Sequence, residues 1–159
     1  MFLPLRSRPA LLACAALGTI ALVFGNGAAI ARATGPFWMS ENALQNAFSG
    51  AEITGTYSDG RTFNEKYDRT GALVYTEHEP SRHLTGSWSI VRGLFCTIYD
   101  NSGTGGCFRV HRASANCFEF YFETRTEEEA RKSTPRNPSW TARAWRIDQV
   151  ATCDGDPSV

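Results

Sequence analysis

Two clusters of acidic and histidine side chains are the first candidates for chemistry. Residues 77–83 contain two glutamates and two histidines, which together with one more ligand could bind a divalent cation. Pro80 in the same segment is typical of a turn, so we predict an exposed hairpin tip and no metal site. Glu119 and Glu123 lie four residues apart, about 13 Å along one strand, which is too far for the paired carboxylates of a glycosidase.

Motifs for nucleophilic catalysis and for phosphate binding are missing from the sequence. Ser87 follows a glycine but does not belong to a G-x-S-x-G turn. The glycine-rich run at 103–106 leads into a predicted strand, whereas phosphate-binding loops lead into a helix. His111 falls on the opposite face of its strand from Val110, so we expect it to face solvent and not to bind a haem or a metal. We therefore predict a protein without catalytic activity and without a cofactor.

Four cysteines in the main part of the chain predict two disulfide bonds. Cys96, Cys107, Cys117 and Cys153 contain no C-x₂-C pair, so a zinc site is not expected. Four cysteines allow three connectivities. If residues 100–103 form a hairpin turn, Cys96 lies directly opposite Cys107, within the distance that a disulfide tolerates. That register leaves Cys117 to pair with Cys153.

The N-terminus has the three regions of a secretory signal peptide. Arg6 and Arg8 are followed by an uncharged, apolar run at 10–24 and by an A-x-A cleavage pattern at 31–33. The apolar run is shorter than the roughly 20 residues that span a membrane. We expect residues 1–33 to be removed on export, which leaves one domain at 34–159 in the periplasm or outside the cell.

Composition and charge narrow the classes of partner. The chain has 159 residues, with 16 basic and 16 acidic side chains, and three of the basic ones precede residue 34. The remaining 13 basic residues (16 minus three) face all 16 acidic ones, which argues against nucleic-acid binding. A hydrophobic content of 42% excludes wholesale disorder. Because no second long apolar run follows, we expect no membrane span after cleavage.

The elements that must position these residues are mainly strands. Ser40 is a suitable cap for one short N-terminal helix, and Gly50 is a suitable end for it. Residues 126–139 should form an exposed helical turn and a proline-bearing loop. Short connections favour an antiparallel up-and-down meander, either a small barrel or a curved sheet. The predicted strands are 52–57, 61–69, 72–79, 84–91, 94–99, 107–112, 117–124 and 140–148.

Five short motifs between about residues 44 and 122 follow one another in a familiar order. They are Gly55-Thr56-Tyr57, Tyr67-Asp68-Arg69-Thr70-Gly71, Gly86-Ser87-Trp88, Phe95-Cys96 and Cys107-Phe108-Arg109-Val110. This order resembles the G-x-W, cysteine, cysteine core of a family of small exported proteobacterial proteins of uncharacterised function. The resemblance implies a periplasmic or secreted β-rich domain and supplies no catalytic residue.

The remaining candidates for a functional role are aromatic side chains. Inward-facing aromatic residues usually pack in the core, but in a small barrel they can also line a ligand cavity. We select Trp88, Phe95 and Phe120 as candidate ligand contacts, and Trp140, beside a loop, as a residue of a mouth or a partner surface.

We expect an exported binding protein of the cell envelope whose partner is a protein, a glycan or a small apolar ligand. One alternative is a carrier of an apolar ligand inside the barrel. Another is an inhibitor of an envelope hydrolase that acts through loops near 80, 100–106 or 131–140. A filled core would argue against the carrier, and a large apolar void would argue against the inhibitor.

Overall fold

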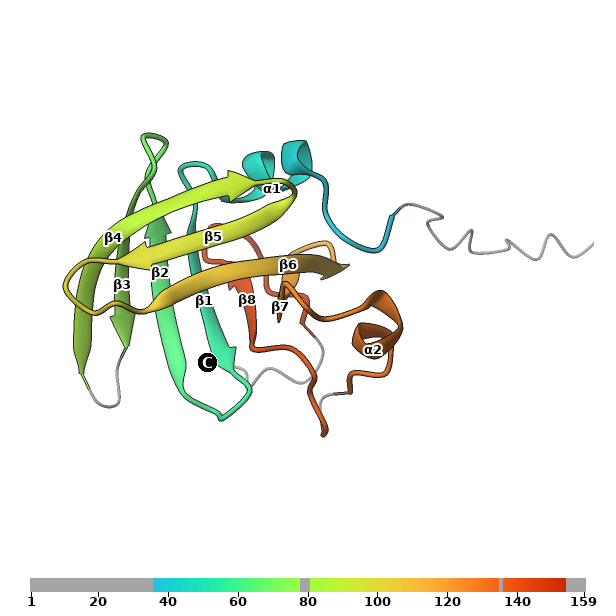
Figure 1. The fold of residues 1–159 in the computed structure, drawn as a ribbon. Coiled ribbons are helices and arrows are strands. Elements are labelled where there is room, and N and C mark those ends of the chain that lie inside the picture. Colours follow the sequence, from blue (N-terminus) through green and yellow to red (C-terminus); the bar gives the residue numbers. More distant parts are fainter. Residues whose placement is uncertain (1–35, 78–80, 135, 154–159) are drawn as a thin grey trace, which may run out of the picture. The chain divides into compact units, whose positions relative to one another are not determined.

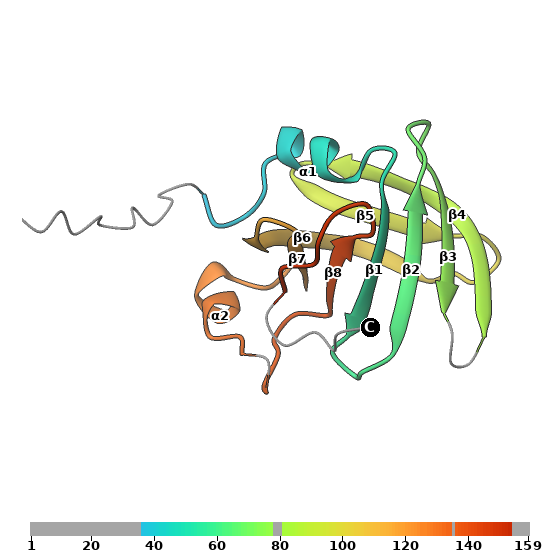
Figure 2. The same cartoon turned by 180° about the vertical axis from the view of Figure 1, so that it is seen from behind.

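Eight antiparallel strands close into a barrel, in which each strand pairs with the next and β8 pairs back with β1 (Figures 1 and 2). This computed structural model describes residues 36–77, 81–134 and 136–153, so the expected signal peptide lies outside the described residues. The meander, the N-terminal helix and the two disulfides are as predicted, and of the two alternatives the sheet forms the barrel. The elements are α1 (Glu41–Phe48), β1 (Glu52–Tyr57), β2 (Thr62–Tyr67), β3 (Ala72–Glu77), β4 (Arg82–Val91), β5 (Leu94–Tyr99), β6 (Gly105–Ser114), β7 (Cys117–Phe122), α2 (Glu127–Arg131) and β8 (Ala142–Arg146).

Alternation along the strands decides what lies inside the barrel. In β2 the buried positions are Phe63, Glu65 and Tyr67, and the residues between them point outward. Gly86 permits β4 to approach β5, because a Cβ at this position would clash with the carbonyl oxygen of Ile98. The interior is therefore built from aromatic side chains, with an acidic residue at an inward position of β2.

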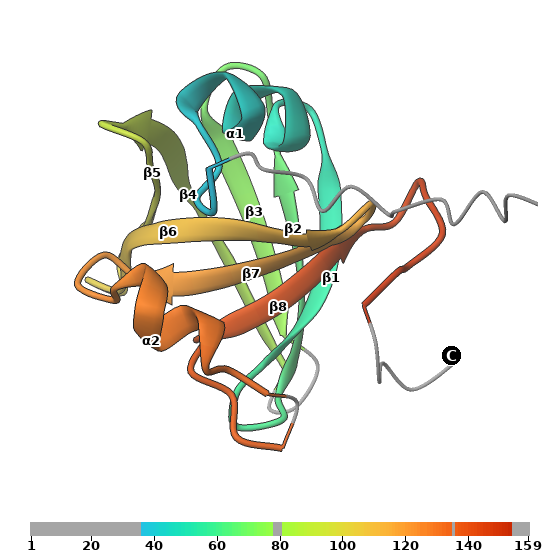
Figure 3. The same ribbon diagram turned by 90° about the vertical axis from the view of Figure 1, so that its right-hand side faces the viewer.

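Helix α1 lies at one end of the barrel (Figures 1 and 3). Ser40 caps it as predicted, because its Oγ accepts a hydrogen bond from the backbone N–H of Ala43 at 3.3 Å. Its apolar face contributes Leu44 and Phe48 to the main hydrophobic core. After the helix, Gly50 adopts a φ of +73°, which turns the chain into β1. The helix thus fills the barrel end nearest to the start of β1.

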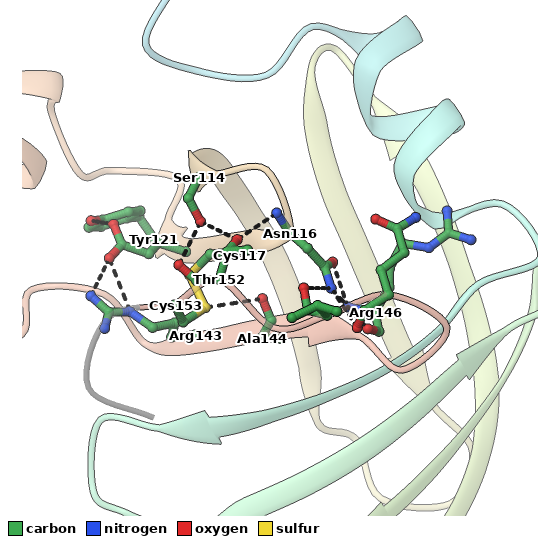
Figure 4. The surroundings of a disulfide bond; sticks show 12 residues. Ser114, Asn116, Cys117, Tyr121, Arg143, Ala144, Arg146, Thr152 and Cys153 are labelled. Atoms are coloured by element: carbon green, nitrogen blue, oxygen red, sulfur yellow. Dashed lines mark hydrogen bonds and ion pairs between the residues drawn. A yellow bond between two sulfur atoms is a disulfide. The ribbon is translucent and has the colours of Figure 1, made fainter. Parts of the chain in front are cut away.

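Both predicted disulfide pairings are present. Cys96 and Cys107 are directly opposed on β5 and β6, with their Cα atoms 4.1 Å apart. The second bond joins Cys117, at the start of β7, to Cys153 in the C-terminal segment (Figure 4). Asn116 supports this junction, because its Nδ2 lies within 3.2 Å of three backbone carbonyl oxygens of residues 146, 149 and 150. The C-terminal segment is therefore held to the barrel covalently and by hydrogen bonds.

A second, smaller cluster lies on the outside of β7, next to α2 (Figure 3). Tyr121, Ala130 and Trp140 form it, and Phe37 packs against them. The ring of Phe37 also stacks on His111 at 3.9 Å, and its carbonyl oxygen lies 2.8 Å from His111 Nδ1. His111 is therefore on the outer face, as predicted, but it is covered by the chain before α1 instead of facing solvent. Within the described ranges, no helix has the length and apolar character needed to cross a membrane.

Candidate functional site

The barrel interior contains a cavity of about 330 Å³. Nine aromatic side chains line it, and three of them, Tyr57, Tyr99 and Phe122, are the last residues of their strands at the end remote from α1. At this end Phe122 and Arg82, which also lines the cavity, are exposed. The cavity therefore opens to solvent at the barrel end opposite α1.

A buried carboxylate lies within this aromatic wall. Glu65 is only 6% exposed, and it points inward between Phe63 and Tyr67 along β2. Both of its oxygens accept hydrogen bonds: Oε2 from the hydroxyl of Tyr67 and Oε1 from the hydroxyl of Tyr99. Burial raises the pKa of Glu65, and the two hydroxyl donors act against that rise. No lysine, arginine or histidine in the described part of the chain forms an ion pair with it.

A second buried carboxylate, nearer to the open end, is neutralised by the protein itself. Glu77 is 2% exposed, and its Oε1 lies 2.7 Å from the Nη1 of Arg61. The same guanidinium also pairs with Asp59 at 2.9 Å. The two inward-facing carboxylates of β2 and β3 thus differ. Glu77 has an arginine partner, whereas Glu65 has only hydroxyl partners.

Four tyrosines supply hydroxyl groups to the cavity wall, which also includes three threonines and two arginines. Tyr57 donates a hydrogen bond to the hydroxyl of Tyr75 at 3.3 Å, while Tyr67 and Tyr99 donate to Glu65. Burial is the largest cause of the raised pKa of each of these phenols, so all four stay neutral at ordinary pH. Around Glu65 the cavity therefore presents apolar rings, neutral hydroxyls and one carboxyl group, while Arg61 and Arg82 line its open end.

The four aromatic residues selected from the sequence lie in three different environments. Phe95 and Phe120 line the cavity. Trp88 is buried in the core, where its ring stacks on Phe95 at 5.8 Å and its Nε1 donates to the carbonyl oxygen of Asp68 at 2.8 Å; it does not reach the cavity. Trp140 is 8% exposed and belongs to the outer cluster, so the expectation of a mouth residue is corrected. It lies outside the barrel because β8 begins at Ala142, two residues later than predicted.

Glu65, the buried carboxylate of the site, was not predicted, although the sequence contains a signal for it. Phe63, Glu65 and Tyr67 alternate at a spacing of two, which places a glutamate on the same strand face as two aromatic residues. Tyr75 and Glu77 repeat this pattern on β3. An acidic residue in phase with core aromatics is uncommon, because an unpaired buried charge is unfavourable.

The described members of the acidic and histidine clusters considered from the sequence do not form a metal site. No three His, Cys, Asp or Glu side chains among residues 36–77, 81–134 and 136–153 are placed to hold a metal ion. His83 is exposed, and the other histidine of that cluster lies outside the described residues. Glu119 forms an ion pair with Arg143 at 2.7 Å and accepts a hydrogen bond from Tyr121 at 2.7 Å, whereas Glu123 is exposed.

Comparisons with protein-family models and with curated proteins found no match to this chain. The resemblance to small exported proteobacterial proteins therefore remains a prediction from the five motifs. What the protein does must be argued from the geometry of the barrel interior.

Proposed function

We propose that this protein is an exported, non-catalytic binding protein that holds a small ligand inside its barrel. The observation that carries the proposal is the cavity of about 330 Å³. Helix α1 fills one end of the barrel, and the cavity is open at the other. This volume is at the lower limit of the roughly 300–1,000 Å³ that is usual for ligand pockets. Apolar walls with a few directed polar groups are typical of such pockets, and aromatic rings with four hydroxyls fit that description.

The interior void also favours a carrier over the loop-based inhibitor of an envelope hydrolase. A protein that acts only through its loops has no need for an open interior, and close-packed cores are the rule in small domains. Here several inward positions carry small residues, such as Thr97 and Ala142, where larger side chains would fill the space. Their small size is consistent with space kept for a ligand.

We place the protein in the periplasm or outside the cell. Its two disulfides support this location, since such bonds persist in oxidising compartments. The expected signal peptide at 1–33 points in the same direction. We therefore expect the protein to act at the cell envelope, and to do so by binding a ligand in its cavity and not by catalysis.

The proposal can be tested with an uncharged fluorescent ligand and a cavity-filling variant. The disulfide-bonded protein is titrated with N-phenyl-1-naphthylamine, and the emission of the probe is followed. Ala142→Phe places a ring in the cavity, while Ala72→Phe adds the same ring at an exposed position of β3 and serves as the control.

We expect saturable binding of one probe per chain, a loss of at least about tenfold in affinity for Ala142→Phe, and no change for Ala72→Phe. Thermal unfolding of both variants checks that the barrel is intact. Absence of saturable binding, or equal affinity of Ala142→Phe and the unaltered protein, would overturn the proposal and direct attention to the loops at the open end.

A further inference from the structure

We propose that the ligand of this cavity is a small organic cation, whose ammonium group binds the carboxylate of Glu65. This inference rests on the proposed function, because it names the chemical class that the same cavity accepts. It is carried by the contrast between two buried carboxylates in one barrel, Glu65 and Glu77.

The hydrogen bonds of Glu65 are those of a carboxylate that accepts on both oxygens. The hydroxyls of Tyr67 and Tyr99 each donate to a different oxygen, and each oxygen keeps a further lone pair for another donor. Two tyrosine donors orient the group and hold it in place. They do not neutralise it, since a phenol with a raised pKa carries no charge.

No cationic side chain among the described residues forms an ion pair with Glu65. Where this protein keeps its other interior carboxylate, at Glu77, it supplies the Arg61 guanidinium at 2.7 Å. A buried charge without a partner is strongly unfavourable, so buried carboxylates are normally paired. A ligand that brings its own cation would supply at Glu65 what Arg61 supplies at Glu77.

The wall around Glu65 is suited to a cation as well. Tyr75 lies directly opposite Glu65 in the β2–β3 ladder, and the hydroxyl of Tyr57 donates to that of Tyr75 at 3.3 Å. The faces of aromatic rings attract cations within about 6 Å, and a group of such rings is a common way to bind an ammonium ion. Phe108 and Phe122, which also line the cavity, stack at 5.9 Å and offer an apolar wall for the hydrocarbon part of the ligand.

An anionic ligand fits the same cavity less well. Arg61 and Arg82 do line its open end, but Arg61 is already engaged by Glu77 and Asp59. An anion that entered farther would approach the carboxylate of Glu65. The deep part of the cavity therefore selects for positive charge.

Three probes of nearly equal size separate the ligand classes. At pH 7, 2-phenylethylamine is a cation, 2-phenylethanol is uncharged and 3-phenylpropanoate is an anion. Each is titrated into the disulfide-bonded protein by calorimetry, and also into Glu65→Gln. Glu52→Gln, an exposed glutamate on β1, is the matched control.

We expect the amine to bind at least about tenfold more tightly than the alcohol, because both can donate a hydrogen bond to the carboxylate but only the amine brings a positive charge to it. Glu65→Gln should remove this preference by weakening the binding of the amine far more than that of the alcohol, and Glu52→Gln should behave like the unaltered protein. Equal affinity of the unaltered protein for amine and alcohol, or a preference for the propanoate, would overturn the inference even if Glu65→Gln did not fold.

The two proposals fail in different ways. If N-phenyl-1-naphthylamine binds in an Ala142-dependent manner and the amine has no advantage, the cavity is a ligand site and only the cation assignment is wrong. If neither that probe nor any of the three phenyl compounds binds, the proposed function fails as well.

Discussion

Truncation of Phe48 should show how much of the barrel's stability comes from the helix that closes one end. Its side chain is 0% exposed. The ring centroid lies 4.7 Å from that of Phe95, 5.1 Å from Phe118, 5.7 Å from Phe120 and 5.9 Å from Tyr67. Phe48→Ala removes a ring from the centre of this group, and the surrounding strands are held by a closed hydrogen-bonded ladder.

The magnitude follows from burial and from the rigidity of the barrel. Replacing a fully buried phenylalanine by alanine costs about 3–5 kcal/mol of unfolding free energy, and the cost is larger where the site cannot collapse into the space. Individual aromatic pairs add about 0.5–1.5 kcal/mol beyond the burial of area. Because strands on several sides limit collapse, we expect a loss of about 4 kcal/mol for Phe48→Ala, a large fraction of the roughly 5–15 kcal/mol of a typical domain.

Phe122→Ala is the matched control, because this phenylalanine is 58% exposed. Its removal should cost less than about 1 kcal/mol. Both variants are unfolded in urea with the disulfides intact, and tryptophan fluorescence and circular dichroism are compared to test for two-state behaviour. If Phe48→Ala lost less than about 1.5 kcal/mol, or no more than Phe122→Ala, the packing of α1 in the barrel end would not be the stabilising element described.

Three further outcomes can be measured by the same unfolding assay. Replacing Cys117 and Cys153 together by alanine opens a closure of 36 residues and should cost about 4 kcal/mol in the chain-entropy account; a loss below about 1 kcal/mol would contradict it. Asn116→Ala removes the side-chain hydrogen bonds that hold the C-terminal segment and should cost about 2 kcal/mol, and an unchanged midpoint would show that they contribute nothing. Burial raises the pKa of Glu65 above its ordinary value of 4.5, so from pH 4.5 up to that higher value the folded protein keeps a proton that the unfolded chain has released. The unfolding free energy should therefore fall as the pH rises from 4.5, and Glu65→Gln should remove that part of the dependence; parallel pH profiles for the two proteins would refute this assignment.

Much of the fold could be predicted from the sequence because its signals are local. The hairpin turn at 100–103 sets the register of β5 and β6, and that register alone brings Cys96 opposite Cys107. Ser40 and Gly50 mark the ends of α1 by side-chain capping and by a positive φ, which depend on the nearest few residues. Strand ends were predicted less well where they depend on pairing with a neighbouring strand. Strand β8, for example, pairs with β7 only from Ala142 onward.

The candidate site could be predicted only in part. Phe95 and Phe120 line the cavity, and alternation along a strand is enough to place both inside the barrel. Trp140 was assigned to a mouth because it stands beside a loop, but the outer face of β7 and α2 bury it. Glu65 was overlooked because its importance depends on the side chains that surround it in the closed barrel.

Local signals in the chain were enough to predict the class of fold, the disulfide partners and the inward strand face of Phe95 and Phe120. These follow from turn residues and from the two-residue period of a strand, which are properties of neighbours in the chain. The tertiary structure was needed to establish that the sheet closes, that α1 fills one end, and that an open volume of about 330 Å³ remains at the other. It also decided that Glu77 meets Arg61 while Glu65 meets two tyrosines, because side chains 16 and 34 residues apart come together only when the strands have closed around them.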